Sequence, residues 1–181
     1  MGRSALYAAA TTLSCLLLGY PLAYFIAFHG GRYRSQLLGL GVLPFWSSYL
    51  IRTFAWMTLL QTEGFLNFVL LKLHLVAQPL TLLNTPVAVI LGLTYGFLPF
   101  ATLPIYVSLE HQDRSLVEAA NDLGASPWEA FWKVVFPLSL PGVISGSLIT
   151  FVHAMGDFVS PEILGGTETQ LIGNLIQQQF L

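Results

Sequence analysis

The sequence is poor in charge and in cysteine. Only 9% of its 181 residues are charged, against roughly 25% in an ordinary soluble domain. The net charge of −2 is too small to indicate a nucleic acid or another strongly charged partner. The single cysteine, Cys15, cannot form an intramolecular disulfide. These absences exclude a disordered tail, a nucleic-acid-binding module and a disulfide-stapled secreted scaffold.

Motifs for phosphate-binding and metal-dependent catalysis are also missing. The sequence contains no GxxxxGK loop, no HExxH pair and no cysteine–histidine cluster with metal-ligand spacing. We therefore expect no catalytic residue, no metal and no cofactor in this chain. Any ATP hydrolysis would have to take place in a partner.

The sequence consists instead of long apolar runs, and 55% of its residues are hydrophobic. No charged residue falls within 4–31, 35–51, 73–109 or 134–156. A helix needs about 20 apolar residues to cross a bilayer core of about 30 Å. The runs therefore predict an all-α, multi-pass membrane bundle. The expected spans are about 5–28, 37–60, 82–108 and 142–160, and a further apolar segment starts within 171–181.

Two stretches depart from a simple spanning helix. Residues 82–108 contain three prolines, and each proline removes a backbone donor and clashes with the preceding turn. We expect a broken or bent helix that lines a pathway. The less hydrophobic stretch 61–79 could form a short helix along the membrane surface.

Lysine and arginine are unevenly divided between the predicted loops. The turn near residue 32 and the stretch near residue 120 together hold four of them, whereas the opposite side holds Arg3 and Lys72, with Arg52 buried nearer to it. Cytoplasmic loops of membrane proteins carry an excess of these residues. The charge-rich stretch 109–140 is therefore expected on the cytoplasmic side.

The stretch from Ser115 to Pro141 predicts two short helices joined by a turn. Ser115–Glu118 and Ser126–Glu129 each have the form of a capping box, in which a serine and a glutamate satisfy each other's backbone amides. Gly124 suits the left-handed position that ends a helix, and Pro137 is expected to end the second helix.

Each of these helices has an apolar face at helical spacing. The first face contains Leu116, Ala119, Ala120 and Leu123, and the second contains Trp128, Phe131, Trp132 and Val135. Helices of about two turns are marginal alone in water, so these must pack on something. Their support could be the bilayer or the bundle end, or a cytoplasmic partner, with one helix facing each.

Five positions of the hairpin have a characteristic spacing: Glu118, Ala119, Ala120, Gly124 and Pro137. They resemble the EAA loop of binding-protein-dependent ABC importer permeases of type I, with Val134 and Phe136 where that family has isoleucine and leucine. The resemblance implies that these five residues belong to a coupling hairpin. Such a hairpin sits in a groove of a separate ATPase subunit and carries nucleotide-driven closure into the membrane helices.

Other segments resemble the spermidine/putrescine permeases of that family: 19–24, 43–46, 51–56, 83–86, 156–166 and 172–174. The resemblance implies four or five of the family's spans, without its first and last, in a multi-pass protein of the cell inner membrane. It also implies three protein partners, an ABC ATPase, a second permease in a heterodimer and an extracytoplasmic solute-binding protein. Polyamines are the expected solute, and iron, opines or another small solute are alternatives.

Candidate residues of the substrate pathway carry a carboxylate or an aromatic ring. Gly146, Thr150, His153 and Asp157 recur along one face of the last span. The Asp157 carboxylate could attract a cationic substrate, or it could cap a neighbouring backbone. Aromatic faces attract ammonium groups by about 0.5–2 kcal/mol, which adds four candidates: Trp46, Tyr49, Trp56 and Tyr95.

Two further residues in the spans have structural interpretations. We expect His153 to be a helix–helix hydrogen-bond partner, and Arg52 to extend toward the interface or to pair with a carboxylate such as Glu63.

Two other functional classes remain open. A non-energised channel or scaffold would need no docking hairpin. A secondary transporter would be expected to show an internal repeat.

Overall fold

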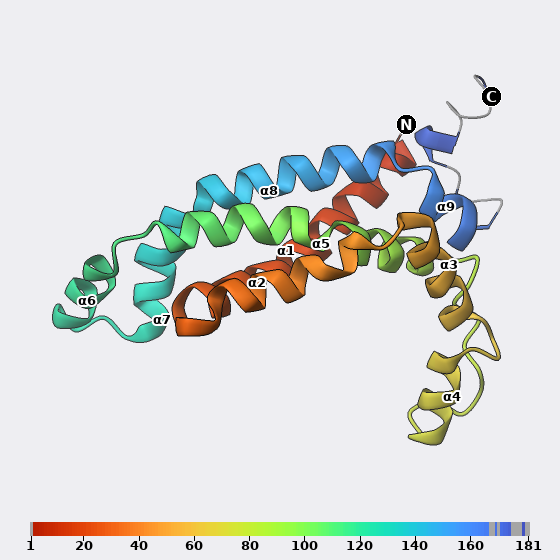
Figure 1. The fold of residues 1–181 in the computed structure, drawn as a ribbon, viewed down its shortest axis with the longest axis horizontal. Coiled ribbons are helices and arrows are strands. Elements are labelled where there is room, and N and C mark those ends of the chain that lie inside the picture. The colour runs from red at the N-terminus through yellow and green to blue at the C-terminus, as the bar shows by residue number, and fades with distance from the viewer. Residues whose placement is uncertain (1, 167–168, 170, 175–178, 180–181) are drawn as a thin grey trace.

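The computed structural model describes residues 2–166, 169, 171–174 and 179, and its regular elements are helices (Figure 1). In chain order they are α1 (Gly2–His29), α2 (Arg34–Val42), α3 (Tyr49–Leu60), α4 (Phe65–Lys72), α5 (Pro86–Glu110), α6 (Arg114–Asp122), α7 (Pro127–Ala130), α8 (Phe136–Gly156) and α9 (Val159–Leu164). Short 3₁₀ turns span Gly31–Tyr33 and Leu43–Trp46, and a π-helical turn, Phe131–Val135, joins α7 to α8. Most of the segment 171–181 lies outside the described residues.

Four helical stretches within the described residues are long and apolar enough to cross a membrane. They are Gly2–His29, Tyr49–Lys72, Pro86–Glu110 and Pro127–Gly156. The predicted all-α membrane bundle is thereby confirmed.

The stretch 37–60 is not a single spanning helix. The backbone is extended at Ser47 and Ser48, with ψ angles of 153° and 136°, so α2 and α3 are separate. The Ser47 hydroxyl donates to the Pro44 carbonyl oxygen at 2.7 Å, a local bond that competes with helix formation. The long apolar stretch therefore begins at Tyr49 and continues through α4.

The core is formed by α1, α5 and α8, which pack against one another (Figure 1). Small residues allow their backbones to approach closely. A Cβ atom added at Gly146 of α8 would lie 2.8 Å from the Ala101 carbonyl oxygen of α5. Buried side chains of all three helices fill the centre, among them Cys15, Leu93 and Ala154.

Of the two alternatives predicted for the third span, a broken or a bent helix, the break is wrong. Pro86 stands in the first turn of α5, where its missing N–H has no cost, and the Thr85 hydroxyl accepts the Ala88 N–H at 3.3 Å. Pro99 and Pro104 lie inside the helix, which nevertheless runs without a break to Glu110. An interior proline costs about 3 kcal/mol or more, and packing against both α1 and α8 offsets this cost.

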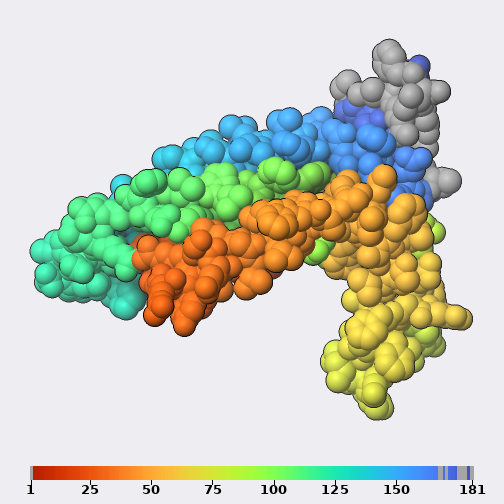
Figure 2. Space-filling view, viewed as in Figure 1, coloured from red at the N-terminus to blue at the C-terminus, as the bar shows by residue number. Residues whose placement is uncertain are grey.

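The two ends of the bundle differ. At one end lie α6, α7 and the turn between α1 and α2 (Figure 1). Arg34, at the start of α2, and Glu110, at the end of α5, form an ion pair at 3.5 Å. At the other end lie α3, α9 and the N-terminus. From this second end α4 projects away from the bundle (Figure 2).

Candidate functional site

The hairpin begins with α6, whose N-cap is Asp113 rather than Ser115. The Asp113 carboxylate accepts the Ser115 N–H at 2.9 Å, and this bond holds the pKa of the Asp113 carboxyl below its usual value. The predicted capping box Ser115–Glu118 is therefore wrong. Aspartate and serine are comparable N-caps, but only aspartate adds a negative charge to the positive end of the helix dipole.

The turn after α6 has the predicted left-handed glycine. Gly124 has a φ of +84°, which glycine adopts without the penalty that a Cβ atom brings. The Gly124 N–H donates to the Asn121 carbonyl oxygen at 2.9 Å, and the Ala125 N–H donates to that of Ala120 at 3.0 Å. These two bonds are those of a Schellman motif, so the end of α6 is fixed by its own backbone.

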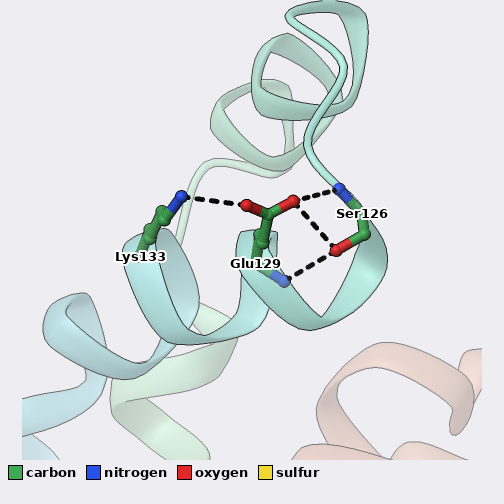
Figure 3. A network of polar contacts seen from close by, with 3 residues as sticks. All are labelled: Ser126, Glu129 and Lys133. Carbon is green, nitrogen blue, oxygen red and sulfur yellow. Dashed lines mark hydrogen bonds and ion pairs between the residues drawn. The ribbon is translucent and has the colours of Figure 1, made fainter.

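The second capping box is confirmed (Figure 3). The Ser126 hydroxyl accepts the Glu129 N–H at 3.3 Å, and the Glu129 carboxylate accepts the Ser126 N–H at 3.0 Å. Lys133 donates to the same carboxylate at 3.0 Å, one turn further on. The start of α7 is therefore set by three neighbouring polar side chains.

Pro137 does not end the second helix, contrary to the prediction. The helix continues from α7 through the π-helical turn Phe131–Val135 into α8. In this turn the Phe136 N–H bonds to the Phe131 carbonyl oxygen, five residues back. A proline ring clashes with the carbonyl four residues before it in an α-helix, and the wider turn accommodates the ring. The hairpin is consequently continuous with a spanning helix.

The face of α6 that carries the EAA residues is open. None of the nine residues of α6, all within the described part of the chain, is buried. Leu123, directly after the helix, is 89% exposed, and Leu116 is 46% exposed. Glu118 and Ala119 are exposed as well, whereas Val117 packs against the bundle.

The second half of the hairpin rests on α1. The Phe131 ring meets those of Tyr20 and Tyr24 edge-on, at centroid distances of 5.9 and 5.6 Å. Trp128, by contrast, is 68% exposed, and Trp132 is also exposed. The bundle end therefore supports the second half of the hairpin, and no residue of the α6 apolar face is buried by the described part of the chain.

A second candidate site lies at the opposite end of α8, where a cavity of about 410 Å³ opens. It is lined by Tyr49, Phe97, Val152, His153, Gly156, Asp157 and Phe158. The cavity therefore combines one carboxylate, one phenol and one imidazole with two phenyl rings.

The Asp157 carboxylate accepts several hydrogen bonds beside this cavity, and the residue is only 8% exposed. Its carboxylate accepts the Tyr49 hydroxyl at 2.9 Å. It also accepts the backbone N–H of Ser160 at 3.1 Å and that of Val159 at 3.4 Å, so it caps the start of α9. The Tyr49 hydroxyl lies 2.7 Å from the Ser160 hydroxyl as well. Two of the predicted pathway residues thus meet, although 108 positions separate them.

The other predicted pathway residues do not join this cavity. Trp46 is 88% exposed. Trp56 and Tyr95 contact each other edge-on at 5.4 Å, but neither lines the cavity.

The polar stripe on α8 does not form one continuous lining. Gly146 and Thr150 are buried. The predicted hydrogen bond from His153 to another helix is not formed. Instead, His153 Nδ1 lies 2.8 Å from the Ile149 carbonyl oxygen of its own helix. Its ring stacks on that of Phe100 at 5.0 Å. Stacking on α5 takes the place of the expected hydrogen bond.

Of the two alternatives predicted for Arg52, extension toward the interface or an ion pair with Glu63, the structure contradicts the ion pair. The Arg52 guanidinium lies 4.3 Å from the centroid of the Phe45 ring and 5.7 Å from that of Tyr49. The ion pairs within the described residues do not include it, so the pairing with Glu63 is wrong. A cation–π contact with Phe45 replaces that pairing.

Phe97 and Phe158 line the cavity, and Phe100 stacks on the His153 imidazole. None of these three residues was predicted as part of the site from the sequence. A phenylalanine within an apolar run looks the same whether it packs in a core or lines a cavity. Within the described residues no group of three or more metal-ligating side chains is clustered.

The structure thus combines a bundle of apolar, span-length helices with a capped hairpin beyond one end and a cavity containing Asp157 near the other. The family model described as "Binding-protein-dependent transport system inner membrane component" matches residues 17–180. The chain belongs to this family, which confirms the resemblance noted in its sequence, and it is a multi-pass membrane protein.

Three relatives are similar over nearly the whole chain. The spermidine/putrescine transport system permease protein PotB of Haemophilus influenzae is 44% identical over 94% of this chain and 59% of its own length. PotB of Escherichia coli is 45% identical over 94% of this chain and 62% of its own length. The inner membrane ABC transporter permease protein YdcU of Escherichia coli is 33% identical over 98% of this chain and 60% of its own length. The chain thus spans about three fifths of the length of these relatives.

Proposed function

We propose that this chain forms part of the membrane subunit of an ATP-driven polyamine importer and docks on a separate ATPase through its hairpin. The observation that carries the proposal is the open apolar face of α6. This face holds Ala119, which is exposed, and Ala120, which is half-buried, and it extends beyond the bundle end.

The geometry of the hairpin suits a groove in a partner protein. Burying an exposed leucine side chain contributes about 1.5–3 kcal/mol, and Leu123 projects almost completely into solvent. Ala119 and Ala120 would allow the partner's backbone to approach closely. The Schellman turn at Gly124 and the Ser126 capping box hold the hairpin in one shape before docking, which lowers the entropy lost on binding.

A docked hairpin could transmit movement because it is continuous with α8. From Pro127 to Gly156 the backbone is helical without interruption. A partner that closes around its ATP would therefore move a spanning helix directly. The hairpin and the Arg32–Arg34 turn lie at the same end of the bundle, which we assign to the cytoplasm on the basis of their positive charge.

The polyamine assignment rests on the relatives and on the Asp157 cavity. Two relatives at 44% and 45% identity are named as spermidine/putrescine permeases. A polyamine carries several ammonium groups, and the cavity is lined by the Asp157 carboxylate and by the aromatic side chains of Phe97 and Phe158. An arriving ammonium would compete with the Tyr49 hydroxyl for Asp157.

The complete importer would contain this subunit, a second permease, the ATPase and an extracytoplasmic solute-binding protein. We would reconstitute this assembly in liposomes and measure its ATPase activity. Stimulation by binding protein loaded with spermidine or putrescine, and not by protein loaded with iron or an opine, is the expected result.

The role of the hairpin is tested in the same assembly with Leu123→Ser. This variant should weaken co-purification of the ATPase and abolish the stimulation. Leu75→Ser is the matched control, because Leu75 is 67% exposed but lies after α4, away from the hairpin. If Leu123→Ser behaves like Leu75→Ser, the chain is a non-energised channel or scaffold and the proposal fails.

A further inference from the structure

We propose that Arg114 is a positioning residue that carries movement of the hairpin into α1. The inference rests on the proposed coupling function and extends it beyond the EAA residues. The hairpin runs directly into α8 through a continuous helical backbone. Within the described residues, no such continuous helix joins the hairpin to α1. Arg114 provides a contact between the hairpin and the end of α1.

The contact is a charged hydrogen bond across a long stretch of sequence. Arg114 Nη2 donates to the carbonyl oxygen of Ala27 at 3.0 Å, 87 positions away. The guanidinium also lies 5.7 Å from the centroid of the Phe28 ring. Ala27 is among the last four residues of α1, whose carbonyls have no donor within the helix. A cation at this end also interacts favourably with the α1 dipole, and hydrogen bonds from charged donors are stronger than neutral ones.

The position of Arg114 is not explained by the stability of α6. Arg114 is the first residue of that helix, where the helix dipole disfavours a positive charge. The favourable interactions of the Arg114 guanidinium are those with the end of α1. A side chain that weakens its own helix but bonds to a neighbouring one is suited to joining the two.

Val117 places the same side of α6 against the bundle. Residues three apart lie on one face of a helix, so Arg114 and Val117 face the bundle together. Val117 packs against the buried cluster that contains Ile26 and Ala27 of α1. The opposite face, with Leu116 and Ala119, is exposed. A partner that moves the exposed face of α6 would also move the face that carries Arg114, and through the Arg114–Ala27 hydrogen bond it would move the end of α1.

A third contact ties the start of the hairpin to its end. Gln112 Nε2 donates to the Val135 carbonyl oxygen at 3.1 Å, within the π-helical turn that leads to α8. The hairpin therefore holds α1 and α8 at one end of the bundle, and one docking movement would reach both helices.

The test compares transport per ATP hydrolysed in the assembled importer. Arg114→Gln removes the charge and is expected to lower this ratio about tenfold, while Arg114→Lys, which keeps a charge but lacks the planar fork, should lower it about threefold. Co-purification of the ATPase should persist in both variants, because the docking face is unchanged. Arg34→Gln is the matched control, because it breaks the Arg34–Glu110 pair at the same end of the bundle without touching the hairpin. Its ratio should equal that of the unmodified protein.

The outcomes separate the inference from the proposed function. A normal ratio in Arg114→Gln overturns the inference, as does a normal ratio in Arg114→Lys if the glutamine variant does not assemble. Equal losses in Arg114→Gln and Arg34→Gln overturn it as well. In all three cases the proposed function still stands if Leu123→Ser abolishes stimulation of the ATPase. If Leu123→Ser has no effect, the proposed function itself fails.

Discussion

Replacing Gly124 with alanine tests whether the turn of the hairpin sets the shape that docks. Gly124 has a φ of +84°, and no atom lies within 4 Å of the Cβ that alanine would add. The change is therefore free of steric clash, and its cost is conformational. A left-handed conformation costs an L-residue about 1–2 kcal/mol.

That cost converts directly into a binding effect. If the free Gly124→Ala hairpin leaves the native turn and must regain it to bind the ATPase, a cost of 1–2 kcal/mol lowers the affinity by roughly five- to thirtyfold. The assay is a titration of the detergent-solubilised membrane subunits with the ATPase, read as an apparent dissociation constant. Gly124→Asn should lose less affinity, because asparagine enters the left-handed region more readily than alanine.

Gly39→Ala provides the matched control. Gly39 lies in α2, and an added Cβ there also meets no atom within 4 Å. Alanine in a helix is favoured over glycine by roughly 0.5–1 kcal/mol, so this variant should bind the ATPase normally. If Gly124→Ala also binds normally, the left-handed turn does not determine docking and the reasoning is refuted.

Three further predictions concern other parts of the chain. Ser126→Ala should destabilise the start of α7 by about 0.5–2 kcal/mol, seen as faster hydrogen exchange near Glu129; unchanged exchange would contradict the capping role. Asp157→Asn should weaken polyamine uptake by the importer severalfold more than Tyr49→Phe, because only the first removes the negative charge; equal effects would show that the hydrogen bond between them matters more than the charge. Gly146→Ala should lower the melting temperature of the purified complex, because the added Cβ would lie 2.8 Å from a backbone oxygen of α5. Such overpacking costs about 1–3 kcal/mol. An unchanged melting temperature would mean that α5 and α8 can move apart without cost.

The hairpin was predictable where its structure is local. Gly124 and the Ser126–Glu129 capping box depend on residues within one or two turns, and the structure contains both. The first cap was misplaced because Asp113 and Ser115 are both good N-caps, and the sequence alone does not choose between them. Pro137 was misread because the π-helical turn that accommodates it depends on how the hairpin packs on α1.

The sequence predicts that the membrane part is a helical bundle, but it does not predict where every helix begins and ends. The long apolar runs predict a helical bundle, but they do not reveal the extended backbone at Ser47 and Ser48. The cavity is harder still to foresee, because the meeting of Tyr49 with Asp157 requires the packing of α3 beside α9. Contacts between residues so far apart leave no periodic signal in a single sequence.

Cross-linking from Ala119 to the ATPase tests the account most directly. An Ala119→Cys variant would be placed in the assembled, active importer and labelled with a short reagent that has one thiol-reactive and one photoreactive end. The native Cys15 is fully buried and would not compete for the label. We predict a covalent product with the ATPase whose yield changes when ATP binds, and no such product from Leu75→Cys. Failure of Ala119→Cys to capture the ATPase in any nucleotide state, while the importer remains active, would contradict the account.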